Sequence, residues 1–331
     1  MQETYRAFVV DNTDGNFSAG IRELSSADLP PGDVTIRVEW SCVNYKDGLA
    51  SQPNNRVVRT FPLTTGVDLA GTVTQSSDSR FKAGDQVTVT GYDLGVAHHG
   101  GYAELARVPG DWVAPLPAGL TPKEAMALGT AGLTSAMSID ALERLGLEPS
   151  KGTVIVTGAT GGVGSTAVSM LAGLGYTVAA STGKSTEHDF LRELGATEIL
   201  SREEVSAESN RPIESERWAA AVDPVGGATT AYLIRTTKYG GSVAVSGLTG
   251  GTTVNTTVFP FILRGVNVLG IESVWCPMET RQRIWGRLAT DLKPKGLLES
   301  IAHEVPLEGL PGALAQILRA EVRGRILVRL A

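Results

Sequence analysis

The stretch Gly152–Lys184, GTVIVTGATGGVGSTAVSMLAGLGYTVAASTGK, decides the fold of this chain. It opens with Thr153–Thr157, a β-branched and apolar run typical of a strand that is buried on both faces. Glycines follow at once, and apolar residues then recur at helical spacing up to Gly175. A second apolar run, Tyr176–Ala180, predicts another strand. The pattern is therefore a βαβ unit with a glycine-rich turn between its first strand and its helix.

The glycine-rich turn has the features of a dinucleotide-binding loop. At a helix N-terminus, unpaired N–H groups and the helix dipole attract phosphate. One glycine allows the tight turn, another lets the backbone approach a pyrophosphate, and a third lets helix and strand pack closely. The flanking strand and helix favour this interpretation over a loop that only turns the chain. We expect the cofactor to contact Thr160, Gly161, Gly162 and Val163.

The end of the second strand distinguishes the two nicotinamide cofactors. NAD-specific folds place an acidic residue there, on the ribose 2′-hydroxyl. This strand ends at Ser181, and Thr182, Gly183 and Lys184 follow it with no Asp or Glu among them. A hydroxyl and a lysine suit a 2′-phosphate, so Ser181, Gly183 and Lys184 predict NADPH. The alternative is that Lys184 is an ordinary solvated loop charge.

Length, charge and cysteine content narrow the class of protein. For 331 residues, two domains are the natural expectation. The net charge of −6 leaves no basic excess for nucleic acid. We see no secretory signal at the N-terminus and no apolar run long enough to span a membrane. Two cysteines are too few for a disulfide framework, so we expect a cytoplasmic protein. The charge and the absence of a long apolar run lead us to expect no nucleic-acid or membrane partner.

The chain divides into a β-rich part and an alternating part. Up to about Leu120, short runs rich in Val, Thr and aromatic residues predict a barrel-like module. Their bounds are Arg6–Val10, Asp33–Ser41, Leu69–Gln75, Gln86–Gly91 and Gly101–Val108. From a capping pattern at Thr121–Glu124 onward, helices alternate with strands, which predicts an α/β fold with a doubly wound parallel sheet. The pattern leaves open whether the last strand, Arg325–Leu330, joins this sheet or the β-rich part.

Several stretches outside the glycine loop resemble the medium-chain dehydrogenase/reductase superfamily. They are SCVNYKDGLA (Ser41–Ala50), PLTTGVDLAGTV (Pro62–Val73), KAGDQV (Lys82–Val87), GGYAEL (Gly100–Leu105) and ALGTAGLTSAM (Ala127–Met137). Four others are similar to its quinone oxidoreductase-like group, and there to the acrylyl-CoA reductase branch. These are NYKD (Asn44–Asp47), RVPGDWVAPLP (Arg107–Pro117), PFILRGVNVLGIESV (Pro260–Val274) and RGRILV (Arg323–Val328).

The resemblance implies the domain organisation. A groES-like catalytic domain would comprise residues 1–122 and 295–331, and an NADPH-binding Rossmann domain would comprise residues 123–294. The active site would lie in the cleft between them, and the family is commonly homodimeric.

The resemblance also bears on metal content, because some members of the superfamily use zinc. Catalytic zinc needs three Cys, His or acidic ligands. The positions that resemble the zinc ligands hold Asn44 and Gly66-Val67-Asp68, and the chain has no cysteine cluster for a structural zinc. The adjacent His98 and His99 lack further partners in the sequence. We therefore predict no metal, and reduction of an activated C=C bond rather than alcohol oxidation.

Tyr45 and Asn44 are the candidate catalytic residues. A phenol can donate a hydrogen bond to an enolate oxygen or pass on a proton. The alternative for Tyr45 is a partly buried aromatic packed beside the nicotinamide. The Asn44 amide would position cofactor or substrate, and we expect Lys46 and Asp47 to form an ion pair.

Further cofactor contacts are expected on both sides of the glycine loop. The resemblance places Thr130 and Thr134 against the cofactor, although a helix-capping role for Thr134 is equally economical. Ser246, Gly247 and Leu248 end a predicted strand, at the edge where open α/β sheets bind ligands.

Two arginines, Arg264 and Arg325, complete the candidate cofactor site. The resemblance puts both near the cofactor, and a CoA phosphate or solvent is the alternative for each.

The predicted function is NADPH-dependent reduction of an α,β-unsaturated acyl thioester, acryloyl-CoA to propanoyl-CoA. An NADPH:quinone or small-enone oxidoreductase and a non-catalytic NADPH-binding protein are the alternatives.

Overall fold

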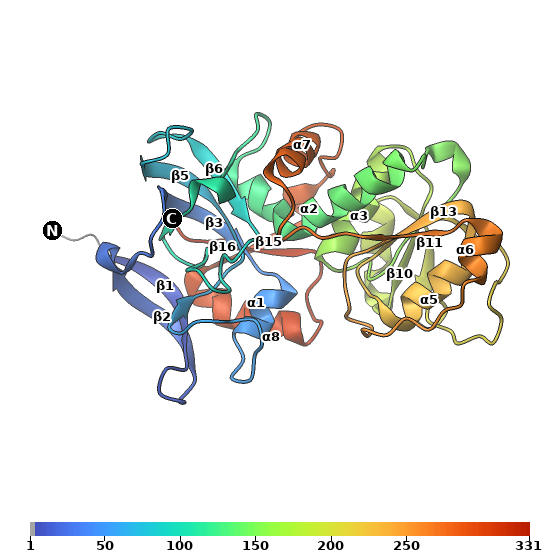
Figure 1. Ribbon diagram of the computed structural model, residues 1–331, viewed down its shortest axis with the longest axis horizontal. Helices are drawn as coiled ribbons and strands as arrows, with labels where there is room; N and C mark the ends of the chain where they lie inside the picture. The colour runs from blue at the N-terminus through green and yellow to red at the C-terminus, as the bar shows by residue number, and fades with distance from the viewer. Residues whose placement is uncertain (1–3) are drawn as a thin grey trace. The chain divides into compact units, whose positions relative to one another are not determined.

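The computed structural model describes residues 4–331, which form two compact units (Figure 1). Unit 1 contains residues 4–130, 274–289 and 301–331. Unit 2 contains residues 131–273 and 290–300. No helix among residues 4–331 has the length and apolar character that crossing a membrane requires.

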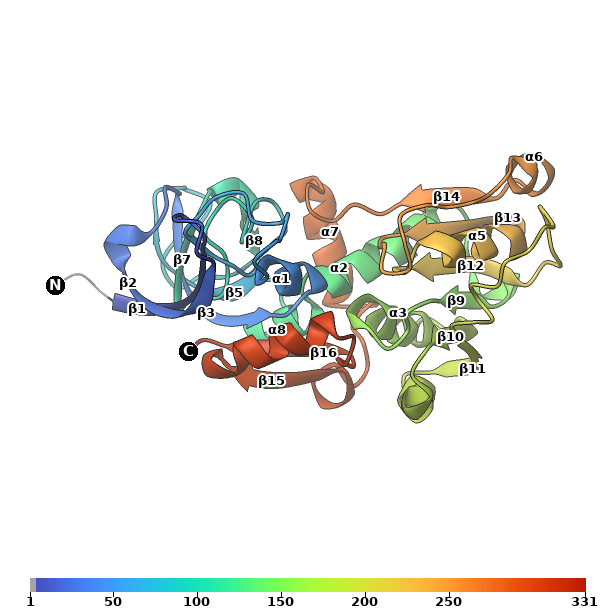
Figure 2. The ribbon, with the colours of Figure 1, turned by 90° about the horizontal axis from the view of Figure 1, so that it is seen from below.

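Unit 1 is built mainly from β-strands. Their bounds are β1 (Thr4–Asp11), β2 (Ser18–Ser25), β3 (Val34–Cys42), β4 (Leu63–Thr64), β5 (Asp68–Ser76), β6 (Gln86–Thr90), β7 (Leu105–Val108), β8 (Ala114–Pro115), β15 (Ala302–Pro306) and β16 (Arg325–Arg329). One sheet has the order β2-β1-β4. The other has the order β15-β16-β3-β5-β6-β8, with β7 paired to β3. Figure 2 labels β3, β5, β7, β8, β15 and β16 of this sheet. The predicted strands of the β-rich part are present, and β2 is an addition that its mostly polar sequence, SAGIRELS, did not signal.

The C-terminal tail belongs to unit 1. Strand β16 pairs antiparallel with β3, so that Leu327 lies opposite Cys42. This pairing settles the question that the sequence pattern left open and agrees with the resemblance. Three α-helices lie wholly within the unit: α1 (Tyr45–Ala50), α7 (Met278–Leu288) and α8 (Leu310–Leu318).

Unit 2 contains the predicted doubly wound parallel sheet. Its strands are β9 (Val154–Val156), β10 (Val178–Thr182), β11 (Ala196–Ser201), β12 (Trp218–Asp223), β13 (Thr237–Val245) and β14 (Asn267–Gly270). The order β11-β10-β9-β12-β13-β14 is parallel throughout. The helices are α3 (Gly162–Gly173), α4 (His188–Glu193), α5 (Gly227–Thr236) and α6 (Phe259–Arg264). Helix α3 packs on β9 and β10, and α5 packs on β12 and β13.

Helix α2 (Pro122–Arg144) carries the boundary between the units. Its start has the predicted capping box, in which Thr121 and Glu124 bond each other's backbone N–H groups. At Gly129 the backbone adopts a φ of +52°, which breaks the helix into two segments. The units therefore meet at residues 130/131 rather than at 122/123. Residues 274–289 also belong to unit 1, where α7 packs on β8, although we predicted them in the Rossmann domain.

Candidate active site

The glycine-rich turn of unit 2 has the predicted geometry. It connects β9 to α3, whose N-cap is Gly161. Gly158 adopts a φ of +53°, a region that favours glycine. A Cβ atom at Gly164 would lie 2.3 Å from the carbonyl oxygen of Gly158, so only glycine fits there. This packing keeps the first turn of α3 against the loop, where its N–H groups are available to a phosphate.

At the end of β10, the structure contradicts one of the predicted cofactor contacts and adds another cation. Ser181 is buried, and its hydroxyl donates to the carbonyl oxygen of Ser201 at 3.3 Å, so the predicted contact of this hydroxyl with a 2′-phosphate is wrong. The side chain of Arg202 packs over Gly183, because its guanidinium lies 2.9–3.0 Å from where a Cβ atom of Gly183 would be. Arg202 and Lys184 thus both lie beside the end of β10. The sequence interpretation overlooked Arg202.

The loop after β13 lies at the predicted carboxyl edge of the sheet. Gly247 approaches the backbone after β12 so closely that its Cβ atom would lie 2.0 Å from the carbonyl oxygen of Pro224. Asp223, fully buried at the end of β12, holds this edge together. Its carboxylate accepts from the Thr157 hydroxyl at 2.6 Å and the Thr230 hydroxyl at 2.5 Å. These hydrogen bonds fix the carboxyl edge of the sheet, where Ser246, Gly247 and Leu248 lie. The sequence interpretation missed Asp223.

The predicted cofactor contact of Arg264 is wrong. Its guanidinium donates to the carbonyl oxygens of Arg235 (3.0 Å) and Thr237 (3.4 Å), and to that of Glu214. Thr237 is the first residue of β13, so Arg264 lies at the amino edge of the sheet. Nucleotides bind at the opposite, carboxyl edge of such sheets.

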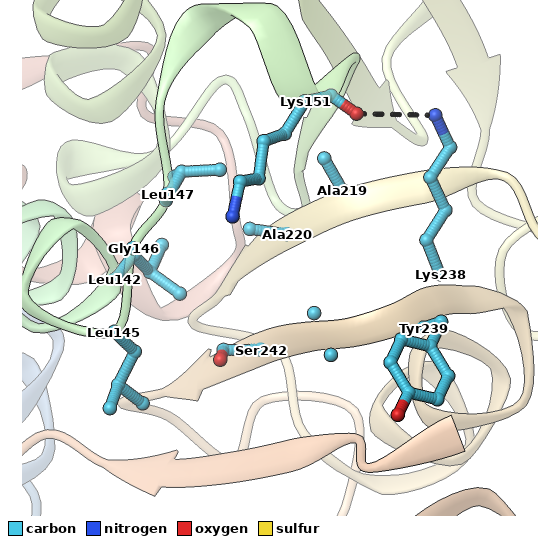
Figure 3. A pocket seen from close by; sticks show the side chains of 12 residues that line it. Leu142, Leu145, Gly146, Leu147, Lys151, Ala219, Ala220, Lys238, Tyr239 and Ser242 are labelled. Carbon is cyan, nitrogen blue, oxygen red and sulfur yellow. Dashed lines mark hydrogen bonds between the residues drawn. The ribbon is translucent and has the colours of Figure 1, made fainter. Parts of the chain in front are cut away.

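A cavity of about 360 Å³ also opens at this amino edge (Figure 3). The starts of β12 and β13 line it together with the end of α2 and the segment that follows it. Lys238 donates to the carbonyl oxygen of Lys151 at 3.3 Å, and Tyr239 lies beside Lys238 (Figure 3). Because the cavity and the glycine loop lie at opposite ends of the strands, this cavity does not belong to the nucleotide site.

A buried hydrogen-bond network in unit 1 is centred on Asp68. Its carboxylate accepts from the Asn44 amide at 2.8 Å and from the Cys42 thiol at 3.1 Å. Thr130 donates to it twice, from its backbone N–H at 2.9 Å and from its hydroxyl at 2.5 Å. Only glycine fits at the preceding kink, because a Cβ atom at Gly129 would lie 2.6 Å from the Cys42 sulfur. Thr130 is therefore part of this network.

Arg325 supplies the positive charge of the network. Its guanidinium donates to the Asn44 side-chain oxygen at 3.2 Å and to the Cys42 sulfur at 2.9 Å. A third hydrogen bond goes to the carbonyl oxygen of Ala127 at 3.3 Å. Only 3% of Arg325 is exposed, so the predicted contact with a cofactor or CoA phosphate is corrected to a role in fixing Asn44.

Asn44 and Tyr45 lie at the start of α1. Asn44 is the N-cap, and its amide bridges Asp68 and Asp47, at 2.8 and 3.2 Å. Tyr45, the first helical residue, is 44% exposed. The predicted ion pair between Lys46 and Asp47 is wrong, because the buried Asp47 carboxylate instead accepts from Asn44 and from the backbone N–H of Val67. The network thus fixes the residue that precedes an accessible phenol.

Burial, and secondly the charge of Asp68, raise the pKa of Asp47 from 3.8 to about 6. Between these values the folded chain binds more protons than the unfolded chain, so its stability falls as the pH rises. We expect the free energy of unfolding of wild type, relative to that of Asp47→Asn, to fall by about 2.4 kcal/mol between pH 4 and pH 7. Urea unfolding at both pH values measures this. A pH-independent difference between the two proteins would contradict the raised pKa, which NMR titration of the carboxyl carbon reports directly.

The residues at the zinc-like positions do not fit a zinc ion. Asn44 turns its amide NH₂ group toward both carboxylates, and Asp68 already accepts four hydrogen bonds. His99 bonds the backbone N–H of Thr64 through Nδ1 at 3.1 Å. Across residues 4–331, no three His, Cys, Asp or Glu side chains cluster as metal ligands would.

Thr134 lies in unit 2, inside the second segment of α2. Its hydroxyl donates to the Ser273 hydroxyl at 2.9 Å. The alternative of a capping role for Thr134 is wrong, because the segment already begins at Thr130.

The structure thus brings together Asn44, Thr130 and Arg325 in unit 1. Thr160–Val163, Gly183, Lys184 and Ser246–Leu248 lie along the carboxyl edge in unit 2.

Comparison with known proteins identifies the family. Residues 30–118 match the alcohol dehydrogenase GroES-like domain, and residues 162–287 match the zinc-binding dehydrogenase domain. The chain is 50% identical to the acrylyl-CoA reductase AcuI of Ruegeria pomeroyi, over 98% of both chains. It is 51% identical over the full length of both chains to YhfP of Bacillus subtilis, which is assigned to the quinone oxidoreductases.

Solved structures agree with this relationship. The yhdH oxidoreductase of Salmonella enterica, in complex with NADP, is 46% identical, with a TM-score of 0.95 over 98% of this chain and 100% of that one. Bacillus subtilis yhfP with NAD bound has a TM-score of 0.97 over 99% and 100% of the two chains. These matches confirm the predicted fold class. The chain belongs to the medium-chain dehydrogenase/reductase family, with quinone oxidoreductases and acrylyl-CoA reductases as close relatives.

Proposed function

We propose that this protein is an NADPH-dependent reductase that converts acryloyl-CoA to propanoyl-CoA. The observation that carries the proposal is the network of Asn44, Asp68 and Arg325, which fixes the start of α1 and its exposed Tyr45. The similarity to AcuI supports the acyl thioester as substrate. The relationship to YhfP supports a quinone as the second candidate substrate.

The cofactor we propose is NADPH, held in unit 2. The turn at Thr160–Val163 and the edge at Ser246–Leu248 would hold its pyrophosphate and nicotinamide ends, and Thr134 would lie near them. Gly183, Lys184 and Arg202 would hold its 2′-phosphate, with no acidic residue to repel it. The relatives were solved with both NADP and NAD, so the preference for NADPH rests on this chain's own two cations. When bound, the cofactor supplies a hydride for the β-carbon of the substrate.

In this proposal the phenol of Tyr45 carries the chemistry of the protein itself. Its O–H donates a hydrogen bond to the thioester carbonyl oxygen, where negative charge develops as the C=C bond is reduced. The enolate then takes a proton at its α-carbon, from Tyr45 or from a water that Tyr45 orients. Asn44 and Asp68 hold the phenol's helix in place. The 44% exposure of Tyr45 leaves it accessible to a substrate.

The experiment is NADPH oxidation by the purified enzyme with acryloyl-CoA and with p-benzoquinone. We expect kcat/KM for acryloyl-CoA to exceed that for the quinone, and Tyr45→Phe to lower kcat about 100-fold, within the range of general acid catalysis. An absence of thioester turnover would overturn the substrate assignment. NADPH binding without turnover of either compound would favour a non-catalytic protein. An unchanged kcat in Tyr45→Phe would remove Tyr45 as the acid.

We also propose that the protein is a homodimer. Strand β14 lies at an edge of its sheet, and α6 beside it exposes large apolar side chains, with Ile262 68% and Leu263 58% exposed. A second copy can pair with an exposed edge and cover such a patch. Light scattering should give a dimeric mass for wild type and a monomeric mass for Ile262→Glu. A monomeric wild type would contradict the proposal.

We also propose a cytoplasmic location, which suits two cysteines that form no disulfide.

A further inference from the structure

Tyr92, directly after β6, has an unusual backbone. Its φ is +54°, in the left-handed region that a bulky side chain rarely adopts. Its N–H donates to the carbonyl oxygen of Val274 at 3.0 Å, which fixes it in this conformation. Residues in such conformations persist only where the surroundings determine them, and they gather at functional sites. The aromatic ring that this backbone presents therefore calls for an explanation.

Two groups hold the ring of Tyr92. The ring of Trp112 stacks parallel to it, with centroids 5.4 Å apart and 2° between the planes. The guanidinium of Arg281 lies 4.6 Å from its centroid. Arg281 is fully buried and donates to the backbone oxygen and the hydroxyl of Thr90, at 2.8 and 2.7 Å. The ring is thus a rigid part of unit 1.

Trp275 stands against this rigid ring and faces solvent. Its ring meets Tyr92 edge to face, with centroids 5.9 Å apart and 84° between the planes. Of its surface, 57% is exposed. Tryptophan offers a large planar contact area, and rigid exposed aromatic rings are the usual surfaces on which nucleic-acid bases stack.

This aromatic group is directly connected to the candidate active site within unit 1. Thr90, which Arg281 holds, lies opposite Asp68 in the pairing of β6 with β5. Asp68 is the centre of the network that holds Asn44 and Thr130. The rings of Tyr92 and Trp275 are therefore anchored one strand away from the residues that position Tyr45.

We propose that Trp275, supported by Tyr92, is the stacking surface for the adenine ring of the acyl-CoA substrate. This inference rests on the proposed function, which supplies a substrate with such a ring. It assigns to unit 1 a second contact with the substrate, remote from the reacting double bond. A quinone is also planar, and the experiment separates the two ligands.

The test compares acryloyl-CoA with acryloyl-pantetheine, which has the same reacting group and no adenine. In Trp275→Ala, the ratio of kcat/KM for acryloyl-CoA to that for acryloyl-pantetheine should fall about 10-fold, as expected for losing one stacked base. Trp275→Phe keeps a ring and should restore most of the ratio. Tyr239→Ala, which removes an aromatic side chain that is 78% exposed in unit 2, should leave the ratio unchanged.

The outcomes separate this inference from the proposed function. An unchanged ratio in Trp275→Ala, with normal turnover of acryloyl-CoA by wild type, overturns the inference and leaves the function intact. A higher KM for p-benzoquinone in Trp275→Ala, with an unchanged thioester ratio, assigns the surface to a quinone and also overturns the adenine assignment. If wild type reduces neither thioester, the proposed function fails and the inference fails with it. Thermal unfolding and the Kd for NADPH verify that each variant is folded.

Discussion

Replacing Arg325 with Met is expected to lower kcat/KM for the substrate about 100-fold, the typical cost of misplacing a reacting group by about 1 Å. Arg325 fixes the side-chain oxygen of Asn44, and Asn44 caps the helix that carries Tyr45. The guanidinium is buried, and Asn44 links it to the buried carboxylates of Asp47 and Asp68. Removing it leaves buried negative charge without compensation, so the free energy of unfolding should fall by about 3–5 kcal/mol. Urea unfolding and steady-state kinetics measure the two effects.

Arg329→Met is the matched control for this prediction. Arg329 lies on the same strand, β16, four residues later, and is exposed. Its replacement should change the free energy of unfolding by less than about 0.5 kcal/mol and leave kcat/KM unchanged. Equal effects of the two substitutions would mean that the strand, and not the buried charge, matters. Arg325→Lys keeps the charge but loses the fork of donors, so it should recover stability more than activity.

Features that depend only on residues close together in the chain could be predicted from the sequence. The βαβ unit follows from spacing within Gly152–Lys184, where strand, glycine turn and helix are contiguous, and each is present as predicted. The network around Asp68 could not be found in this way. Asn44 and Arg325 are 281 residues apart, and only the antiparallel pairing of β16 with β3 brings them together. Resemblance located Arg325 near the site, but its role in fixing Asn44 depends on burial.

For two other arginines, the direction of the neighbouring strands determines at which edge of the sheet each one lies. Arg264 is the last residue of α6 and comes shortly before β14, so it lies near the start of that strand. The resemblance alone gave no information about this edge of the sheet. Arg202 comes directly after β11, which is parallel to β10 and adjacent to it. The carboxyl ends of adjacent parallel strands lie at one edge of the sheet. The end of β11 at Ser201 therefore places Arg202 at the same edge as the end of β10.

The second large effect expected concerns the choice of cofactor. In the double variant Lys184→Gln/Arg202→Gln, the Kd for NADPH should rise about 100-fold, because a charge-assisted hydrogen bond contributes about 1.5–3 kcal/mol. The Kd for NADH should change less than about threefold, since NADH has no 2′-phosphate for these cations to bind. Titration of protein fluorescence with each cofactor measures both constants. The preference for NADPH would then decrease without loss of the fold.

Arg192→Gln is the control for the loss of charge in this region. Arg192 is an exposed arginine on the neighbouring α4, ion-paired with Asp189 at 2.9 Å, and its removal should leave both dissociation constants unchanged. Equal weakening of NADPH and NADH in the double variant would show that Lys184 and Arg202 support the loop rather than the phosphate. An unchanged Kd for NADPH would place the phosphate elsewhere. Only a selective loss of NADPH affinity fits a 2′-phosphate held between Lys184 and the guanidinium that packs over Gly183.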